Sequence, residues 1–154
     1  MRISVRLSGL LIATLLMVGC SAKQDLAEVQ EGIAHFRQLM ADRQFERIYS
    51  EGADQLKKSM TQQQLVRLLS AIDSKLGAVK SAESNGWSVN YNSSGTTVTL
   101  RFKTQFERGT GAETFTYRIV GGKALLANYQ INSNDLIVNE PETRTDANFG
   151  FTAT

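Results

Sequence analysis

The chain carries few of the side chains that perform chemistry at enzyme active sites. Its 154 residues contain one histidine, His35, and one cysteine, Cys20. A single cysteine cannot form a disulfide within the chain, and a single histidine cannot supply a site that needs several imidazole ligands. The sequence therefore predicts no metal site and no bound cofactor.

The other reactive side chains are not arranged in a known catalytic pattern. His35 lies on the expected solvent face of a helix, with no second histidine to complete a dyad. No serine stands in a Gly-x-Ser-x-Gly motif. Gly109 and Gly111 lie between two expected strands, so they do not form the phosphate-binding loop that joins a strand to a helix. We therefore expect no catalytic residues and no enzyme activity.

A small group of residues are candidates for lining a pocket or contacting a partner. They are three aromatic residues with a polar group, one acid expected on a helix and two arginines expected on strands. The members are Tyr49, Asp73, Trp87, Tyr117, Arg101 and Arg118. The two arginines, with Lys103 and several threonines, would form a mildly basic sheet face that could contact an anionic envelope component or a protein. Ordinary packing and an ordinary exposed face explain the same pattern.

Residues 1–19 have the features of a secretory signal peptide. Arg2 and Arg6 precede the apolar run 10–18, and the small residue Gly19 follows it. The run is too short to span the ~30 Å hydrocarbon core of a bilayer as a permanent helix. The chain has 17 basic and 15 acidic residues, an excess of two positive charges. Removal of this segment would remove Arg2 and Arg6 and so leave equal numbers of basic and acidic residues. The mature chain has balanced charge and no basic stripe, so we expect no binding to nucleic acid.

The residues around Cys20 resemble the bacterial lipobox. Apolar residues and then Gly19 directly precede Cys20, with Met17 where such lipoproteins usually have leucine. The resemblance implies cleavage after Gly19, a diacylglycerol on the Cys20 thiol, and a further acyl chain such as palmitate on the new amino terminus. Two or more acyl chains anchor a protein stably in a bilayer. Ser21 resembles the sorting residue of outer-membrane lipoproteins, which implies an outer-membrane anchor facing the periplasm.

The mature chain is long enough for one domain. We expect a lipidated polar tether over 20–24, one domain over 25–138, and a flexible tail over 139–154, which contains the only proline. Apolar residues three or four apart predict helices over 25–40, 44–50 and 61–77.

The ends of these helices also have sequence signals. Asp25 is expected to cap the first helix, and Thr61 with Gln64 matches a capping box before the third. Gly77 is a natural residue with which to end the third helix. The segment 54–60 fits either a turn of helix or a loop.

After Gly77 the apolar residues alternate with polar ones. This period of two predicts strands over 87–91, 98–106, 115–119 and 125–131, joined by short glycine- or asparagine-containing turns. Each strand has one apolar and one largely polar face, as expected for an antiparallel sheet covered on one side. Helices first and strands afterwards predict an α+β fold, with the helices on one face of a four-stranded meander.

The order of elements over residues 36–131 resembles the cystatin-like, nuclear-transport-factor-2-like superfamily. This resemblance implies three N-terminal helices packed in the concavity of a curved four-stranded antiparallel sheet. It also implies a cone-shaped pocket between helices and sheet. Members use that pocket as a ligand site, use it as an active site, or fill it with side chains, and the fold does not select among these uses.

Three functions remain open at this point. The first is an envelope lipoprotein, anchored in the lipid bilayer through acylated Cys20, whose small non-enzymatic domain binds a periplasmic protein or small ligand. The second is an immunity or inhibitor lipoprotein that neutralises a periplasmic toxin or hydrolase. The third is an enzyme that uses the pocket with Tyr and Asp groups for proton transfer. The enzyme requires an open polar cavity with at least two inward ionisable groups, whereas a cavity filled by Phe and Leu would exclude it.

Overall fold

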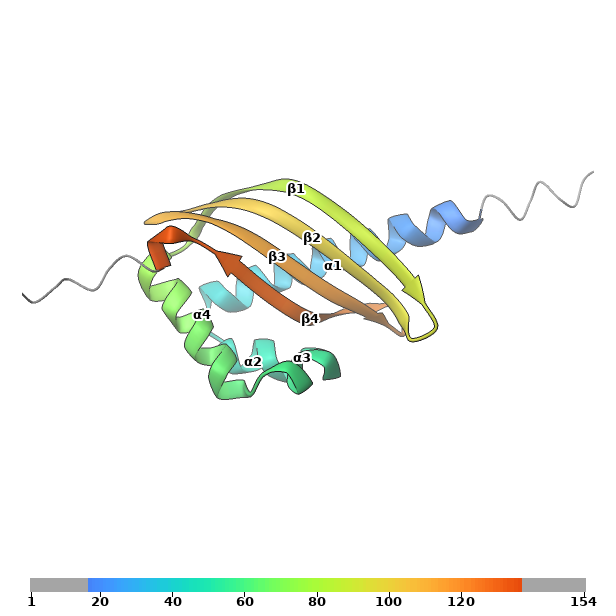
Figure 1. Cartoon of the computed structure of the whole chain (residues 1–154), viewed down its shortest axis with the longest axis horizontal. Helices are drawn as coiled ribbons and strands as arrows, with labels where there is room; N and C mark the ends of the chain where they lie inside the picture. The colour runs from blue at the N-terminus through green and yellow to red at the C-terminus, as the bar shows by residue number, and fades with distance from the viewer. Residues whose placement is uncertain (1–16, 137–154) are drawn as a thin grey trace, which may run out of the picture.

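The structure is a computed structural model that describes residues 17–136. Most of the predicted signal peptide and all of the predicted tail lie outside these residues. The described residues form four helices, then a four-stranded sheet, then one short 3-10 helix (Figure 1). The elements are α1 (Met17–Ala41), α2 (Phe45–Ser50), α3 (Asp54–Ser59), α4 (Gln62–Leu76), β1 (Val79–Asn92), β2 (Gly95–Phe106), β3 (Gly109–Val120), β4 (Lys123–Asn132) and η1 (Asn134–Leu136). The predicted α+β class is confirmed.

The sheet is an antiparallel meander with the spatial order β1-β2-β3-β4. Its strands arch over α1, while α2, α3 and α4 lie on the side of β4 (Figure 1). The register places the apolar residues of β2, β3 and β4 on one face, with Leu100 opposite Phe115 and Phe115 opposite Tyr129. These side chains are buried together with apolar residues of the helices in one core, which confirms the predicted four-stranded meander.

The predicted number and start of the helices were wrong in two respects. First, α1 begins at Met17, so Asp25 lies inside the helix and does not cap it. Residues 20–24 contain no glycine or proline that would stop a helix, so the helix runs through them. Second, the ambiguous segment 54–60 forms α3, because Leu56 is fully buried against the core. Among residues 17–136, no helix is both long and apolar enough to cross a membrane.

The predicted capping box at the start of α4 is confirmed. The backbone N–H of Gln64 donates to Thr61 Oγ1 at 3.3 Å, and the backbone N–H of Thr61 donates to Gln64 Oε1 at 2.8 Å. These two bonds satisfy backbone donors that have no partner within the helix. Gly77 ends the helix with a φ of 75°, a conformation that glycine adopts without strain.

The expectation that every strand has one covered face was wrong for β1. None of its residues is buried, and Trp87 and Tyr91 are 57% and 53% exposed although they lie on the apolar face. The reason is position: β1 is the edge strand opposite β4, on the side of the sheet away from α2 and α3 (Figure 1). Within residues 87–92 of β1, only Val89 packs partly against the core.

Candidate functional site

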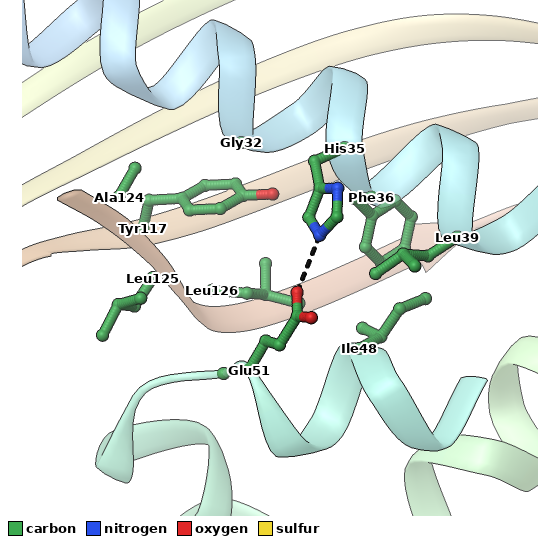
Figure 2. A pocket seen from close by; sticks show the side chains of 11 residues that line it. Gly32, His35, Phe36, Leu39, Ile48, Glu51, Tyr117, Ala124, Leu125 and Leu126 are labelled. Carbon is green, nitrogen blue, oxygen red and sulfur yellow. Dashed lines mark hydrogen bonds and ion pairs between the residues drawn. The ribbon is translucent and has the colours of Figure 1, made fainter. Parts of the chain in front are cut away.

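A surface pocket lies between α1, α2 and the paired ends of β3 and β4; we call it the α1–α2 pocket (Figure 2). Its volume is about 100 Å³. Most of its wall is apolar, and the apolar side chains come from α1, α2 and β4: Phe36, Leu39, Ile48, Ala124, Leu125 and Leu126. Three ionisable residues, His35, Glu51 and Tyr117, complete the wall.

His35 and Glu51 form a hydrogen-bonded pair at the rim of this pocket. The distance from His35 Nε2 to Glu51 Oε2 is 2.7 Å, and Arg47 Nε donates to the other oxygen of Glu51 at 2.6 Å. Because a carboxylate only accepts, the Nε2 of His35 carries the proton in this bond. Partial burial raises the pKa of Glu51, but the hydrogen bonds from His35 and Arg47 outweigh it and hold the pKa below its ordinary value.

Tyr117 forms the inner wall of the pocket. Its side chain is almost fully buried, and its hydroxyl points toward His35 (Figure 2). The ring lies directly against Gly32 of α1, where an added Cβ would stand 2.8 Å from Tyr117 Cε1. Burial raises the pKa of the Tyr117 hydroxyl well above its ordinary value. The glycine is therefore required for the close approach of this ring to the helix.

The wall of the α1–α2 pocket combines apolar side chains with three ionisable groups. A carboxylate that orients a histidine is one part of a nucleophilic triad, but no Ser, Thr or Cys lines the pocket among the described residues. A dry cavity of about 150 Å³ is known to accept benzene, so this smaller pocket has room for one small apolar group. It contains ionisable residues, but its wall is mainly apolar.

A second hollow, which we call the α1–α4 cleft, lies between the C-terminal ends of α1 and α4 and has a volume of about 410 Å³. Asp73 is one of its lining residues and binds Arg43 at 3.0 Å. Arg108 donates to the last carbonyls of α4, including Asp73 O at 2.9 Å and Ser74 O at 2.7 Å. The charged groups of the described cleft thus bind one another or the backbone.

Glu113 forms the floor of the cleft and was missed by the sequence reasoning. Its side chain is completely buried, and both terminal nitrogens of Arg37 donate to its two oxygens. The hydroxyls of Tyr129 and Thr104 donate to the same carboxylate at 2.7 Å and 2.5 Å. Burial raises the pKa of Tyr129, and the charge of Glu113 raises it further. Because four donors satisfy this carboxylate, it fixes α1 to the sheet and leaves no lone charge for a ligand.

The structure does not bring the remaining candidates to either hollow. The Tyr49 hydroxyl donates to Met60 O at 3.3 Å and joins α2 to the end of α3. Trp87 is exposed on β1. Arg101 and Arg118 lie on the polar face of the sheet, opposite Thr114 and Thr97. The predicted basic, threonine-rich face therefore exists, but it lies away from both hollows.

His35 and Glu51 show where the site reasoning failed. The expectation that His35 is not buried is confirmed, since half of its side chain is exposed. The sequence offers no second histidine to pair with it, and its partner is a carboxylate sixteen positions along the chain. No sequence spacing identifies this pair, because it depends on how α2 packs against α1.

Within residues 17–136, no cluster of three or more His, Cys, Asp or Glu is arranged to hold a metal ion. Comparison with protein-family models, with curated proteins and with solved structures finds no significant match to this chain.

Proposed function

We propose that the protein is a lipid-anchored envelope protein whose domain binds a partner protein through the α1–α2 pocket. The partner inserts one apolar side chain, and the pair His35–Glu51 contacts polar groups around it. The observation that carries this proposal is an apolar surface pocket of about 100 Å³ with a polar, hydrogen-bonded rim.

The size and wall of the pocket match the way proteins recognise each other. Binding energy at interfaces concentrates on a few large side chains that enter well-packed pockets, with polar groups around them. A leucine-sized group fits a pocket of this volume, whereas a lipid chain or a sugar chain does not.

The anchor in this proposal is Cys20, on the strength of the lipobox-like sequence before it. Cys20 and the first fully buried core residue, Val29, both lie on α1. At about 1.5 Å per residue, that helix separates them by roughly 14 Å. The anchor would therefore hold the domain close to the membrane surface, and its partner would be an envelope protein.

We also propose the finer fold assignment, a cystatin-like or nuclear-transport-factor-2-like arrangement. The support is an antiparallel meander that arches over α1, with the apolar core between sheet and helices. An experimental structure with α1 on the polar face of the sheet would contradict it.

Filling the pocket tests the binding proposal. Ala124 lines the pocket and is partly exposed, so Ala124→Phe should occupy the space without disturbing the core. The matched control is Ala112→Phe, an exposed position on the polar face of β3. Isobutanol, whose branched group is leucine-sized, serves as a probe of the empty pocket, measured by amide chemical shifts at Gly32 and Leu126. We expect isobutanol binding for wild type and Ala112→Phe and at least a tenfold weaker affinity for Ala124→Phe.

The same two variants test whether a partner protein binds through the pocket. A photo-crosslinking residue in place of exposed Val120, near the β3–β4 turn, should capture one envelope protein in native membranes. Ala124→Phe should abolish that product, and Ala112→Phe should retain it. Equal capture by both variants would show that the pocket is not the binding site.

Cys20→Ala tests the anchor separately. We expect the variant to move from the membrane fraction to the soluble envelope fraction while its urea midpoint stays that of the wild type. Retention in the membrane fraction would rule out the lipid anchor and leave the pocket proposal intact.

A further inference from the structure

The two edges of the sheet differ in how they are covered. At the β4 edge, the link between α2 and α3 lies against the strand, and Ala53 N–H donates to Leu126 O at 2.9 Å. At the other edge, β1 runs for 14 residues without a buried side chain. Three of the four exposed large apolar residues in the described chain lie on this strand: Val79, Trp87 and Tyr91. A long uncovered edge strand is a template for pairing with another strand.

The register shows which backbone groups face the open edge. Asn92 and Gly95 are paired across the two-residue turn between β1 and β2, and residues that close such a turn exchange hydrogen bonds with each other. Hydrogen-bonded and non-hydrogen-bonded pairs then alternate along the ladder. Val89 and Trp87 therefore occupy the non-hydrogen-bonded positions, opposite Val98 and Leu100. Their N–H and C=O groups point away from β2, toward the open edge.

We propose that β1 pairs with β1 of a second copy of this chain, antiparallel and centred on Val89. In this register Val89 lies opposite Val89 of the other copy, and Trp87 lies opposite Tyr91. On the polar face, Ser88 lies opposite Asn90. The two four-stranded sheets then join into one continuous sheet.

The occupant is a second copy because the edge is complementary to itself. Reversal of residues 87–91 about Val89 places apolar residues opposite apolar ones and polar residues opposite polar ones. Residues 84–92 contain no charged side chain, so a twofold axis brings no like charges together. The Tyr91 hydroxyl donates to Asp25 of α1 at 3.2 Å, which positions its ring for the contact.

The bulge before Trp87 sets the limit of the interface. The register between β1 and β2 shifts between Ser84 and Trp87, where Gly86 has a φ of 113°. Such a bulge bends an edge strand and ends regular pairing. The regular stretch after Gly86 is therefore the part of β1 that offers a straight edge, and Val89 is the middle of its residues 87–91.

Disulfide trapping in native membranes tests the proposal with the full-length chain. Residues at the centre of an antiparallel twofold pair have Cα atoms about 5.5 Å apart, within the range that a disulfide bridges. Val89→Cys should therefore form a disulfide-linked dimer of the chain under mild oxidation. Asn90→Cys is the matched control, since two copies of position 90 are offset by two residues and lie about 8 Å apart. We expect at least a tenfold higher dimer yield for Val89→Cys than for Asn90→Cys or the chain without a substitution, whose only cysteine is Cys20.

A second variant tests the backbone pairing itself. Val89→Pro removes an N–H that faces the open edge and leaves the bonds to β2 in place. We expect this variant to keep the wild-type urea midpoint at low concentration and to sediment as a monomer where the wild type sediments as a dimer. A monomeric wild type, equal trapping at positions 89 and 90, or trapping of position 89 to a different protein would each overturn the proposal.

Discussion

Glu113 holds α1 in place over the sheet. Its carboxylate accepts hydrogen bonds from Arg37, Thr104 and Tyr129, and it is completely buried. Removing one member of a buried ion pair leaves the other charge without compensation and typically costs about 3–5 kcal/mol. We expect Glu113→Ala to lower the free energy of unfolding by that amount, measured by urea denaturation. The neighbouring Thr114→Ala, on the polar face, is the control and should change it by less than about 0.5 kcal/mol.

The double variant Arg37→Met with Glu113→Leu separates the charge from the packing. Replacement of a whole buried ion pair by apolar side chains is often neutral, but the buried hydroxyls of Thr104 and Tyr129 still lose their acceptor. The double variant should therefore recover part of the loss of Glu113→Ala. A double variant as unstable as Glu113→Ala would show that the geometry of the network, rather than the stranded charge, determines stability.

Tyr117 makes stability depend on pH in the alkaline range. Burial raises the pKa of its hydroxyl above the ordinary value of 10.0, which the unfolded chain retains. Above pH 10 the unfolded state therefore loses a proton that the folded state keeps, so stability falls as the pH rises. Tyr117→Phe removes this contribution, which has a slope of up to about 1.4 kcal/mol per pH unit. In urea titrations we expect Tyr117→Phe to match wild type at pH 8 and to be the more stable protein at pH 11.

Glu113 and Glu51 differ in how far the sequence could have revealed them. Glu113 stands in the same alternating phase as Phe115 and Tyr117, which places an acid at a core position of a strand. That signal was present in the sequence and pointed to a buried, partnered carboxylate. Glu51 gives no such signal, because its pairing with His35 arises only when α2 folds back along α1.

At the scale of elements, the periodic stretches with clear end signals were predicted well. α4 has a capping box, an apolar stripe and a terminal glycine, and all three are found as expected. α3 lacked a periodic stripe long enough to identify, because one fully buried residue, Leu56, secures its six residues. The exposed face of β1 was not predictable from alternation, since alternation gives the faces of a strand but not whether a helix covers one of them.

The contact between α1 and β3 should reverse the usual effect on stability of replacing a helical glycine by alanine. Replacing an interior helical glycine by alanine normally stabilises by about 1 kcal/mol. At Gly32 the new Cβ would stand 2.8 Å from the buried ring of Tyr117, and overpacking of a core typically costs about 1–3 kcal/mol. We expect Gly32→Ala to lower the free energy of unfolding by about 1 kcal/mol in urea. The control is Ala27→Gly at an exposed position of the same helix, which should lower it by about 1 kcal/mol through propensity alone. A more stable Gly32→Ala would show that α1 and the ring of Tyr117 separate easily.

At the scale of the whole molecule, stability is unevenly distributed. The buried core draws on all four helices and on β2, β3 and β4, while β1 adds no buried side chain to it. Regions with few buried apolar contacts open with the lowest free energy. A single β1 strand is therefore the part of the sheet that should open first, unless another strand covers its edge.

Hydrogen exchange measures this directly. In the monomeric variant Val89→Pro, we expect the β1 amides of Ser88 and Asn90, which bond to β2, to exchange at least tenfold faster than the amides of Phe115 and Tyr117 in β3. In the wild type at concentrations that favour the dimer, the same β1 amides should slow toward the β3 values, because the second copy of β1 turns an edge strand into an interior one. Slow exchange in β1 of the monomeric variant would mean that β1 is stable without a second strand at its edge. The proposed pairing with a second copy would then have no basis in the stability of β1.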